Sequence, residues 1–218
     1  MINWVLKFGI CLYLASCFLV IAGPVKADTK TNVTVPQRKV FTDVPWGYWA
    51  KGSIELLGGL GVIRGYPDGS FHPEGTITRA EFTMLMVKAK SGRLNNLGLK
   101  SFPDIPTGHW AAAYIDKAVE TELIKGYPNN TFRPNKKVSR VEGVSALARF
   151  DNLPIEEAEA LPFPDILLSH WAAESISAAK KAGLLDYLAS QNFNAKKPLT
   201  RAEAVHLLAK TSFFNAKL

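Results

Sequence analysis

The apolar and polar positions of this chain follow one pattern that recurs every 61 residues. In the second copy, Ala111, Ile115 and Ala118 recur four and three positions apart, which is the spacing of one face of an α-helix. A polar stretch containing Gly and Pro follows, and then a second apolar stripe that includes Val144 and Leu147. Each copy therefore predicts a helix, a loop and a second helix, and the whole chain predicts a mostly all-α fold.

Seven of the positions that carry the same residue in all three copies show that the chain is built from a triplicated unit. A single helical pair of this size cannot bury its own apolar face, and we therefore expect three helix-loop-helix repeats around one shared helical core. The seven positions are Phe41, Asp43, Trp49, Ile54, Phe71, Arg79 and Glu81, then Phe102, Asp104, Trp110, Ile115, Phe132, Arg140 and Glu142, and finally Phe163, Asp165, Trp171, Ile176, Phe193, Arg201 and Glu203.

The N-terminus has the pattern of a secretory signal peptide. The stretch from Phe8 to Gly23 is apolar to weakly polar, is shorter than the roughly 20 residues of a membrane-spanning helix, and leads to Ala27, after which we expect cleavage. A retained anchor starting near Trp4 and a lipidated Cys17 stay open as alternatives. We expect a signal peptide at 1–27, a lead at 28–40, repeats at 41–90, 102–150 and 163–214, and linkers at 91–101 and 151–162.

Cysteine content and charge narrow the class of partner. Both cysteines, Cys11 and Cys17, fall inside the predicted signal peptide, so a mature chain from Asp28 has neither a thiol nor a disulfide. The 26 Lys and Arg, less the two lysines of the signal segment, exceed the 19 Asp and Glu by five. This basic balance suits an anionic partner, and export argues against nucleic acid.

Each second helix is expected to begin with a capping box. A Ser or Thr accepts a hydrogen bond from the backbone N–H three residues on, and the Glu at that third position reaches back to the N–H of the cap. The three pairs are Thr78 and Glu81, Ser139 and Glu142, and Thr200 and Glu203. Gly61 and Gly183 fit the left-handed C-cap that ends the first helix, whereas the second copy has Glu122 there, and Gly126 can end that helix instead.

An arginine directly follows each of these N-caps, at Arg79, Arg140 and Arg201. The partial positive charge of a helix N-terminus disfavours a cation, so three such placements indicate a role beyond stability. Free backbone N–H groups beside a guanidinium suit a carboxylate or a phosphate, and we therefore predict that the three arginines bind an anionic ligand. The alternative is that they pair with the capping glutamates or with loop carbonyls in aid of packing.

The tryptophans that open the first helices, Trp49, Trp110 and Trp171, allow two interpretations. Sugars pack their C–H faces on aromatic rings and an indole N–H can donate a hydrogen bond, so a glycan contact is reasonable. A Trp at the start of an amphipathic helix is more often part of the core, and both roles can coexist if one edge lines a groove. The four histidines lack the spacing of metal ligands, and we predict neither a metal site nor a cofactor.

These motifs together resemble the S-layer homology domain. The resemblance rests on the Phe, Asp and Trp-Ala at the start of each repeat, with Pro45 and Pro106 in the first two, on the loop from Gly65 to Phe71, and on the Thr-Arg-Ala-Glu of residues 78–81. It implies three repeats in a pseudo-threefold arrangement whose helices meet in a central bundle. It also implies grooves between neighbouring repeats that bind secondary cell-wall polysaccharide, often through pyruvyl-ketal sugars. By position, the resemblance implies that the three arginines meet the carboxylate, while Gly65, Gly126 and the three tryptophans shape the groove.

The third repeat departs from this pattern. It has the segment Leu185 to Asn192 in place of the glycine loop, and Tyr187 stands where the first two repeats have Gly65 and Gly126. Because this segment favours a helix, a groove walled by it is in doubt, and we expect Arg201 to contribute least to binding.

The sequence thus predicts an exported protein of the cell envelope, at the cell wall, the S-layer or the periplasmic face. Its predicted partner is a cell-wall polysaccharide or a peptidoglycan-linked polymer, held without a covalent bond. The alternative function is a scaffold or adaptor that binds an envelope protein without direct glycan contact. We predict no enzyme, since the chain shows no carboxylate pair placed for acid–base catalysis.

Overall fold

The computed structural model of the protein describes residues 38–91, 94, 102–106, 108–189 and 191–215. These residues form helices and loops, with isolated β-bridges and no β-strand among them, which confirms the mostly all-α fold. The predicted signal peptide and both cysteines lie outside the described residues. The helices are α1 (Lys51–Gly59), α2 (Arg79–Ser91), α3 (Ala112–Glu120), α4 (Arg140–Phe150), α5 (Ala173–Lys181), the 3₁₀ helix η1 (Asp186–Leu188), α6 (Arg201–Lys210) and α7 (Ser212–Asn215).

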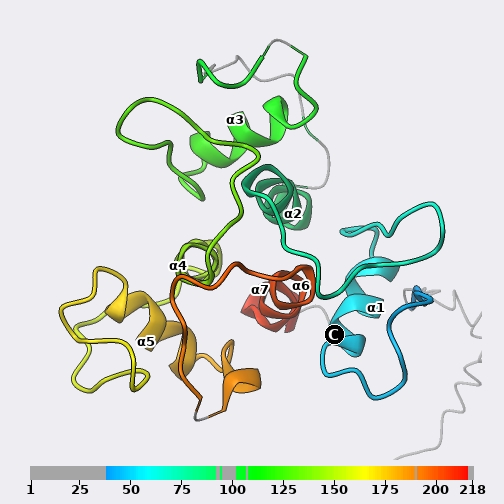
Figure 1. Ribbon diagram of the computed structural model, residues 1–218. Helices are drawn as coiled ribbons and strands as arrows, with labels where there is room; N and C mark the ends of the chain where they lie inside the picture. The colour runs from blue at the N-terminus through cyan, green and yellow to red at the C-terminus, as the bar shows by residue number, and fades with distance from the viewer. Residues whose placement is uncertain (1–37, 92–93, 95–101, 107, 190, 216–218) are drawn as a thin grey trace, which may run out of the picture. The chain divides into compact units, whose positions relative to one another are not determined.

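The helices that pack together come from different repeats. The first helix of each repeat packs on the second helix of the repeat before it, so α3 lies on α2, α5 lies on α4, and α1 closes the series on α6. In Figure 1, α2, α4 and α6 gather at the centre of the view, and α1, α3 and α5 lie outside them. The repeats therefore share one core, as expected.

Three backbone hydrogen bonds join the repeats in a closed cycle just before the second helices. The N–H of Ile77 donates to the carbonyl of Leu199 (3.1 Å), that of Leu199 to Val138 (2.7 Å), and that of Val138 to Ile77 (3.2 Å). All three side chains are buried, so the cycle is shielded from water. The contacts are cyclic, while the threefold rotation implied by the resemblance stays a prediction.

A pair of phenylalanines and an aspartate hold each loop on its repeat. In the first repeat the Phe41 and Phe71 rings pack 5.3 Å apart, and the two carboxylate oxygens of Asp43 accept the backbone N–H groups of Phe71 and His72 at 2.7 Å. The other repeats have the same contacts, through Phe102, Phe132 and Asp104 and through Phe163, Phe193 and Asp165. The repeated aspartates are thus loop-positioning groups.

The second helices begin with the capping boxes. The hydroxyl oxygens of Ser139 and Thr200 accept the N–H of Glu142 and Glu203, and each Glu carboxylate accepts the N–H of its cap. The Thr78 N–H donates to the Glu81 carboxylate at 2.8 Å in the same way. The first helices end at left-handed residues, which are Gly61, Glu122 and Gly183. The expectation that Gly126 ends the helix of the second repeat is wrong, because Glu122 itself adopts a positive φ of 55°.

Candidate functional site

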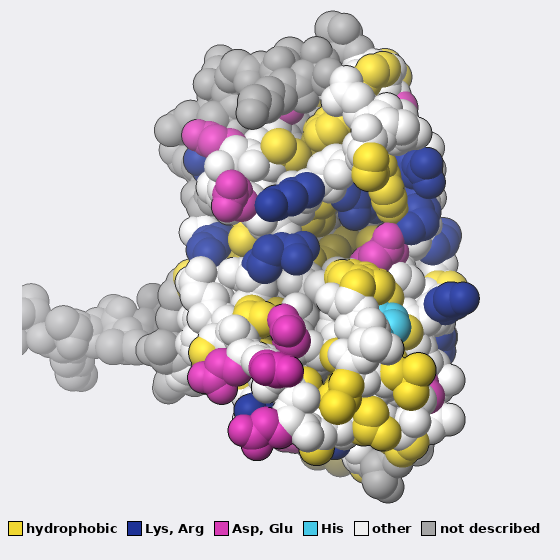
Figure 2. Space-filling view, turned by 90° about the vertical axis from the view of Figure 1, so that its left-hand side faces the viewer, with side chains coloured by type: hydrophobic (Ala, Val, Ile, Leu, Met, Phe, Trp, Pro, Cys, Tyr) yellow, Lys and Arg dark blue, Asp and Glu magenta, His cyan; other side chains and the backbone are white. Residues whose placement is uncertain are grey.

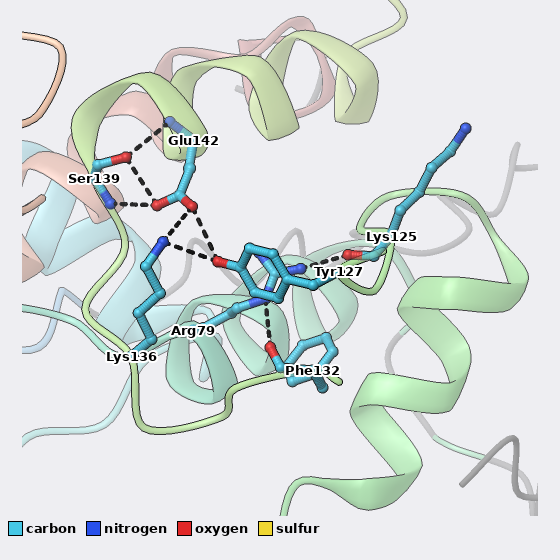
Figure 3. Close-up of polar contacts among 7 residues, drawn as sticks. All are labelled: Arg79, Lys125, Tyr127, Phe132, Lys136, Ser139 and Glu142. Atoms are coloured by element: carbon cyan, nitrogen blue, oxygen red, sulfur yellow. Dashed lines mark hydrogen bonds and ion pairs between the residues drawn. The ribbon is translucent and has the colours of Figure 1, made fainter. Parts of the chain in front are cut away.

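Each predicted arginine ties its own helix to the loop of another repeat. The Nε of Arg79 donates to the carbonyl of Phe132 at 2.9 Å and its NH2 donates to the carbonyl of Lys125 at 2.5 Å (Figure 3). Arg201 reaches back to the first repeat, where it donates to the carbonyls of Phe71 (2.9 Å) and Arg64 (3.4 Å). Some N–H groups of each guanidinium therefore donate hydrogen bonds to loop carbonyls. These bonds hold the loop against the helix, which is a physical reason for a cation at the unfavourable end of a helix.

Arg79 lies beside an open pocket of about 310 Å³ that is lined by residues of all three repeats. Its guanidinium also lies over the rings of Tyr127 and Phe132, 4.9 and 4.7 Å from their centres. Arg149 and Trp171 line the same pocket. Figure 2 shows Lys and Arg side chains gathered beside a hollowed apolar surface on one face of the molecule.

The charge in this pocket is predominantly positive. Burial lowers the pKa of both Arg79 and Arg149 from the usual arginine value, and guanidinium groups nevertheless remain charged in proteins. The acidic side chain that lines the pocket, Glu142, is bound by Lys136 at 2.6 Å and by its N-cap. Burial opposes ionisation of this carboxyl, but the hydrogen bonds from Lys136 and Ser139 hold its pKa at about 2.

Ser145 is a pocket residue that sequence reasoning missed. Its side chain is buried in the lining of the Arg79 pocket, and its hydroxyl has no hydrogen-bond partner among the described residues. The sequence held a signal for it, because this position differs among the three repeats: Ser145 corresponds to Met84 in the first and to His206 in the third. A buried hydroxyl without a partner favours a polar occupant of the pocket.

The site of Arg140 is closed. The Tyr187 ring stacks on Trp49 with centres 4.9 Å apart and planes 12° apart, and the edge of His206 lies against both rings. Arg140 is buried beneath this cluster, where it pairs with the Glu203 carboxylate at 2.5 Å and donates to the carbonyl of Phe193. Burial raises the pKa of Tyr187 and lowers that of His206 to about 4, so neither ring carries charge at neutral pH.

The altered loop of the third repeat faces Arg140 and not Arg201. The expectation that Arg201 contributes least to binding rests on this altered loop, but each arginine reaches the loop of the next repeat in the cycle, so Arg201 contacts the first loop. Arg201 lies over the rings of Tyr66 and Phe71 in the intact first loop and lines a small pocket of about 90 Å³.

The three tryptophans lie at the surface. Their exposed fractions are 44% for Trp49, 55% for Trp110 and 69% for Trp171. The core interpretation is wrong, because the alanine that follows each Trp, such as Ala111, takes the buried position at the start of the helix. Trp171 lines the Arg79 pocket, whereas Trp49 is covered on one face by Tyr187.

Gly65 and Gly126 permit close packing of the loops on the phenylalanine pairs. A Cβ added at Gly126 would lie 2.3 Å from Cε1 of Phe102, and one added at Gly65 would lie 2.3 Å from the carbonyl oxygen of Ser70. Both positions therefore need glycine for packing. Gly126 also lines the Arg79 pocket, so the backbone there is open to an occupant.

The described part of the chain has neither a metal-binding cluster nor a membrane-spanning helix. It holds no group of three His, Cys, Asp or Glu side chains placed to bind a metal ion. In the same residues no helix has the length and apolar character needed to cross a membrane.

Comparison with known proteins identifies the family. The S-layer homology domain matches the chain at residues 40–83, 101–142 and 162–205. These three matches cover more than half of the chain and coincide with the three repeats that share the core. The chain belongs to the S-layer homology domain family.

Proteins of several kinds contain a segment that is similar to this chain. The chain is 36% identical over 145 residues to a cellulosome-anchoring protein of Acetivibrio thermocellus, covering 63% of this chain and 31% of that protein. It is 30% identical over 196 residues to the S-layer protein EA1 of Bacillus anthracis, covering 88% of this chain and 22% of that protein. It is 31% identical over 198 residues to the exoglucanase XynX of Acetivibrio thermocellus, covering 87% of this chain and 17% of that protein.

The chain thus spans about a third or less of the length of these relatives. The family and the relatives support cell-wall anchoring and make this an exported protein of the cell envelope.

Proposed function

We propose that the protein binds an acidic cell-wall polysaccharide, without a covalent bond, in the pocket between Arg79 and Trp171. The observation that carries this proposal is an open pocket that joins guanidinium groups to an exposed indole. An indole face suits the C–H face of a sugar, and a guanidinium suits a carboxylate. A pyruvylated sugar, which the family resemblance implies as the ligand, has both a C–H face and a carboxylate.

Within this pocket, Arg149 supplies more free donor capacity than Arg79. Two nitrogens of Arg79 donate to loop carbonyls, whereas Arg149 donates through Nε to the carbonyl of Leu123 at 3.4 Å. The terminal nitrogens of Arg149 have no hydrogen bond to the described residues. The proposed division of roles is that Arg79 positions the second loop and faces the ligand with its remaining N–H groups, while Arg149 binds the carboxylate.

The three arginines are proposed to contribute unequally. Arg79 stands first because its pocket, of about 310 Å³, is larger than the pocket of about 90 Å³ beside Arg201, which stands second. Arg140 contributes least, since it is buried under Tyr187 and neutralised by Glu203. Of the tryptophans, Trp171 lies in the binding pocket, and Trp49 belongs to the closed site.

The pocket supports binding in preference to catalysis. A glycoside hydrolase uses a carboxylic acid that is still protonated near neutral pH. Glu142, with its pKa at about 2 and its oxygens bound by Lys136 and the N-cap, is unsuited to that role. We propose that the chain itself performs no hydrolysis, and that any reaction at the wall belongs to a protein anchored with it.

Retention on purified wall sacculi tests the proposed function. We expect the protein to be retained on sacculi that keep their secondary polysaccharide and to be lost from sacculi stripped of it. Retention that is unchanged after stripping would contradict the proposal and favour the alternative, an envelope protein as the partner.

Matched variants locate the site in the same assay. Trp171→Ala and Arg149→Ala should each weaken retention at least fivefold, whereas Trp110→Ala and Lys88→Ala, at equivalent positions of other repeats, should leave it within twofold. Equal losses in the paired variants would show that the Arg79 pocket is not the binding site.

A further inference from the structure

A second pocket also has Trp171 in its lining. It has a volume of about 630 Å³ and is lined by His170 and Trp171 from the start of α5 and by Lys196 and Lys197 from the loop before α6. Trp171 also lines the Arg79 pocket, so one exposed indole is shared by both. A chain of sugars that covers this ring can therefore extend into either pocket.

The second pocket is lined by two lysines, of which Lys196 makes no ion pair among the described residues and Lys197 makes only a long one. Lys196 is exposed and has no ion pair or hydrogen bond among the described residues. Lys197 lies 3.8 Å from the Glu203 carboxylate, whose charge already meets Arg140 at 2.5 Å. Asp165 lines the pocket too, but both of its carboxylate oxygens already accept hydrogen bonds from backbone N–H groups of the loop at 2.7 Å.

The equivalent positions of the other repeats lack this free charge. The first repeat has Glu74 in place of Lys196, and the Tyr48 hydroxyl donates to that carboxylate at 2.6 Å. The second repeat has Lys136 in place of Lys197, and this ammonium is bound by Glu142 at 2.6 Å. Two neighbouring lysines beside an exposed indole, one unpaired and one in a long ion pair, are therefore particular to the third repeat, which lacks the glycine loop.

We propose that the Lys196 and Lys197 pocket is a second anion subsite, so that the protein recognises a glycan segment with two carboxylates, one in each of the two pockets that Trp171 lines. This inference rests on the proposed function of the Arg79 pocket and extends it to the adjacent surface. A site that binds two acidic sugars at once has a higher affinity for a polymer with several acidic sugars than for a glycan with one. The reason is that the second contact forms at a high effective concentration once the first has formed.

The test uses oligosaccharides released from the wall polysaccharide and separated into fragments that carry one or two carboxylates. Calorimetry gives the Kd of each fragment for the wild-type chain and for the variant Lys196→Ala with Lys197→Ala. The matched control is Lys117→Ala with Lys181→Ala, which removes the same charge from lysines outside both pockets.

We expect the wild type to bind the two-carboxylate fragment more tightly than the one-carboxylate fragment. The Lys196 and Lys197 variant should lose about tenfold in affinity for the former and less than twofold for the latter. Equal Kd values in variant, control and wild type for both fragments would overturn the second subsite while leaving the proposed function intact. Failure of the wild type to bind either fragment would overturn the proposed function and this inference with it.

Discussion

The Arg140 guanidinium lies 2.5 Å from the Glu203 carboxylate, and both side chains are almost fully buried, at 3% and 5% exposed. The arginine comes from the second repeat and the glutamate from the capping box of the third, so the ion pair joins two repeats. Since the pair is shielded from water, removing either partner leaves an uncompensated charge in the core. At this position the sequence motif that resembles a ligand-binding arginine is part of the fold.

Arg140→Ala is therefore expected to destabilise the protein by about 3–5 kcal/mol. Urea unfolding followed by circular dichroism measures the change. The control is Arg201→Ala, at the equivalent but less buried position, which should cost about 1–2 kcal/mol through the loss of its hydrogen bonds to loop carbonyls. A smaller loss for Arg140→Ala than for Arg201→Ala would refute the assignment of Arg140 to the core.

Gly126→Ala is expected to destabilise the protein by about 1–3 kcal/mol, because the new Cβ meets the Phe102 ring. The control is Gly52→Ala in α1, where an added Cβ has nothing within 4 Å and the gain in helix propensity should stabilise by up to about 1 kcal/mol. Thermal unfolding compares the two. If Gly126→Ala proved as stable as Gly52→Ala, the loop would not need its glycine for packing.

His206 is expected to make the fold weaker in mild acid. Burial, reinforced by Lys210 and opposed by Asp186, lowers its pKa in the fold to about 4. As the pH falls from about 6.5 to 4, the unfolded chain takes up a proton that the folded chain does not, so the free energy of unfolding decreases. Between about pH 7.5 and pH 5.0 the decrease due to this residue should be roughly 1–2 kcal/mol, with allowance for screening by water.

His206→Met, which places the residue of the equivalent Met84 in the site, should remove this part of the pH dependence. Urea midpoints at the two pH values give the comparison. The same slope in the variant and the wild type would mean that another group titrates in this range.

Much of the fold could be predicted from the sequence because its signals are local. The capping pair Ser139 and Glu142 and the stripe of Val144 and Leu147 depend on spacing within one helix, and both are present in the structure. The repeat predicted that the three units share a core, and the packing confirms it. Local signals can still mislead, since Glu122 adopts the left-handed conformation that glycine favours.

The site was harder to predict because its parts meet across repeats. The sequence does not state which loop an arginine touches, and the structure shows that Arg140 faces Tyr187 while Arg201 faces the intact first loop. Trp171 is likewise exposed because the residue after it, Ala172, takes the buried position at the start of the helix. Ser145 could have been found by comparing the three copies, because position-by-position differences between repeats mark where equivalent pockets diverge.

The most direct test of the account is to record which indole N–H resonances shift when fragments of the acidic wall polysaccharide are added to the isotope-labelled protein. The chain has five tryptophans, and Trp→Phe variants assign their signals. The account predicts a saturable shift of the Trp171 signal, which belongs to the open pocket, and an unchanged Trp49 signal, which belongs to the site closed by Tyr187. A shift of Trp49 with no shift of Trp171 would contradict it.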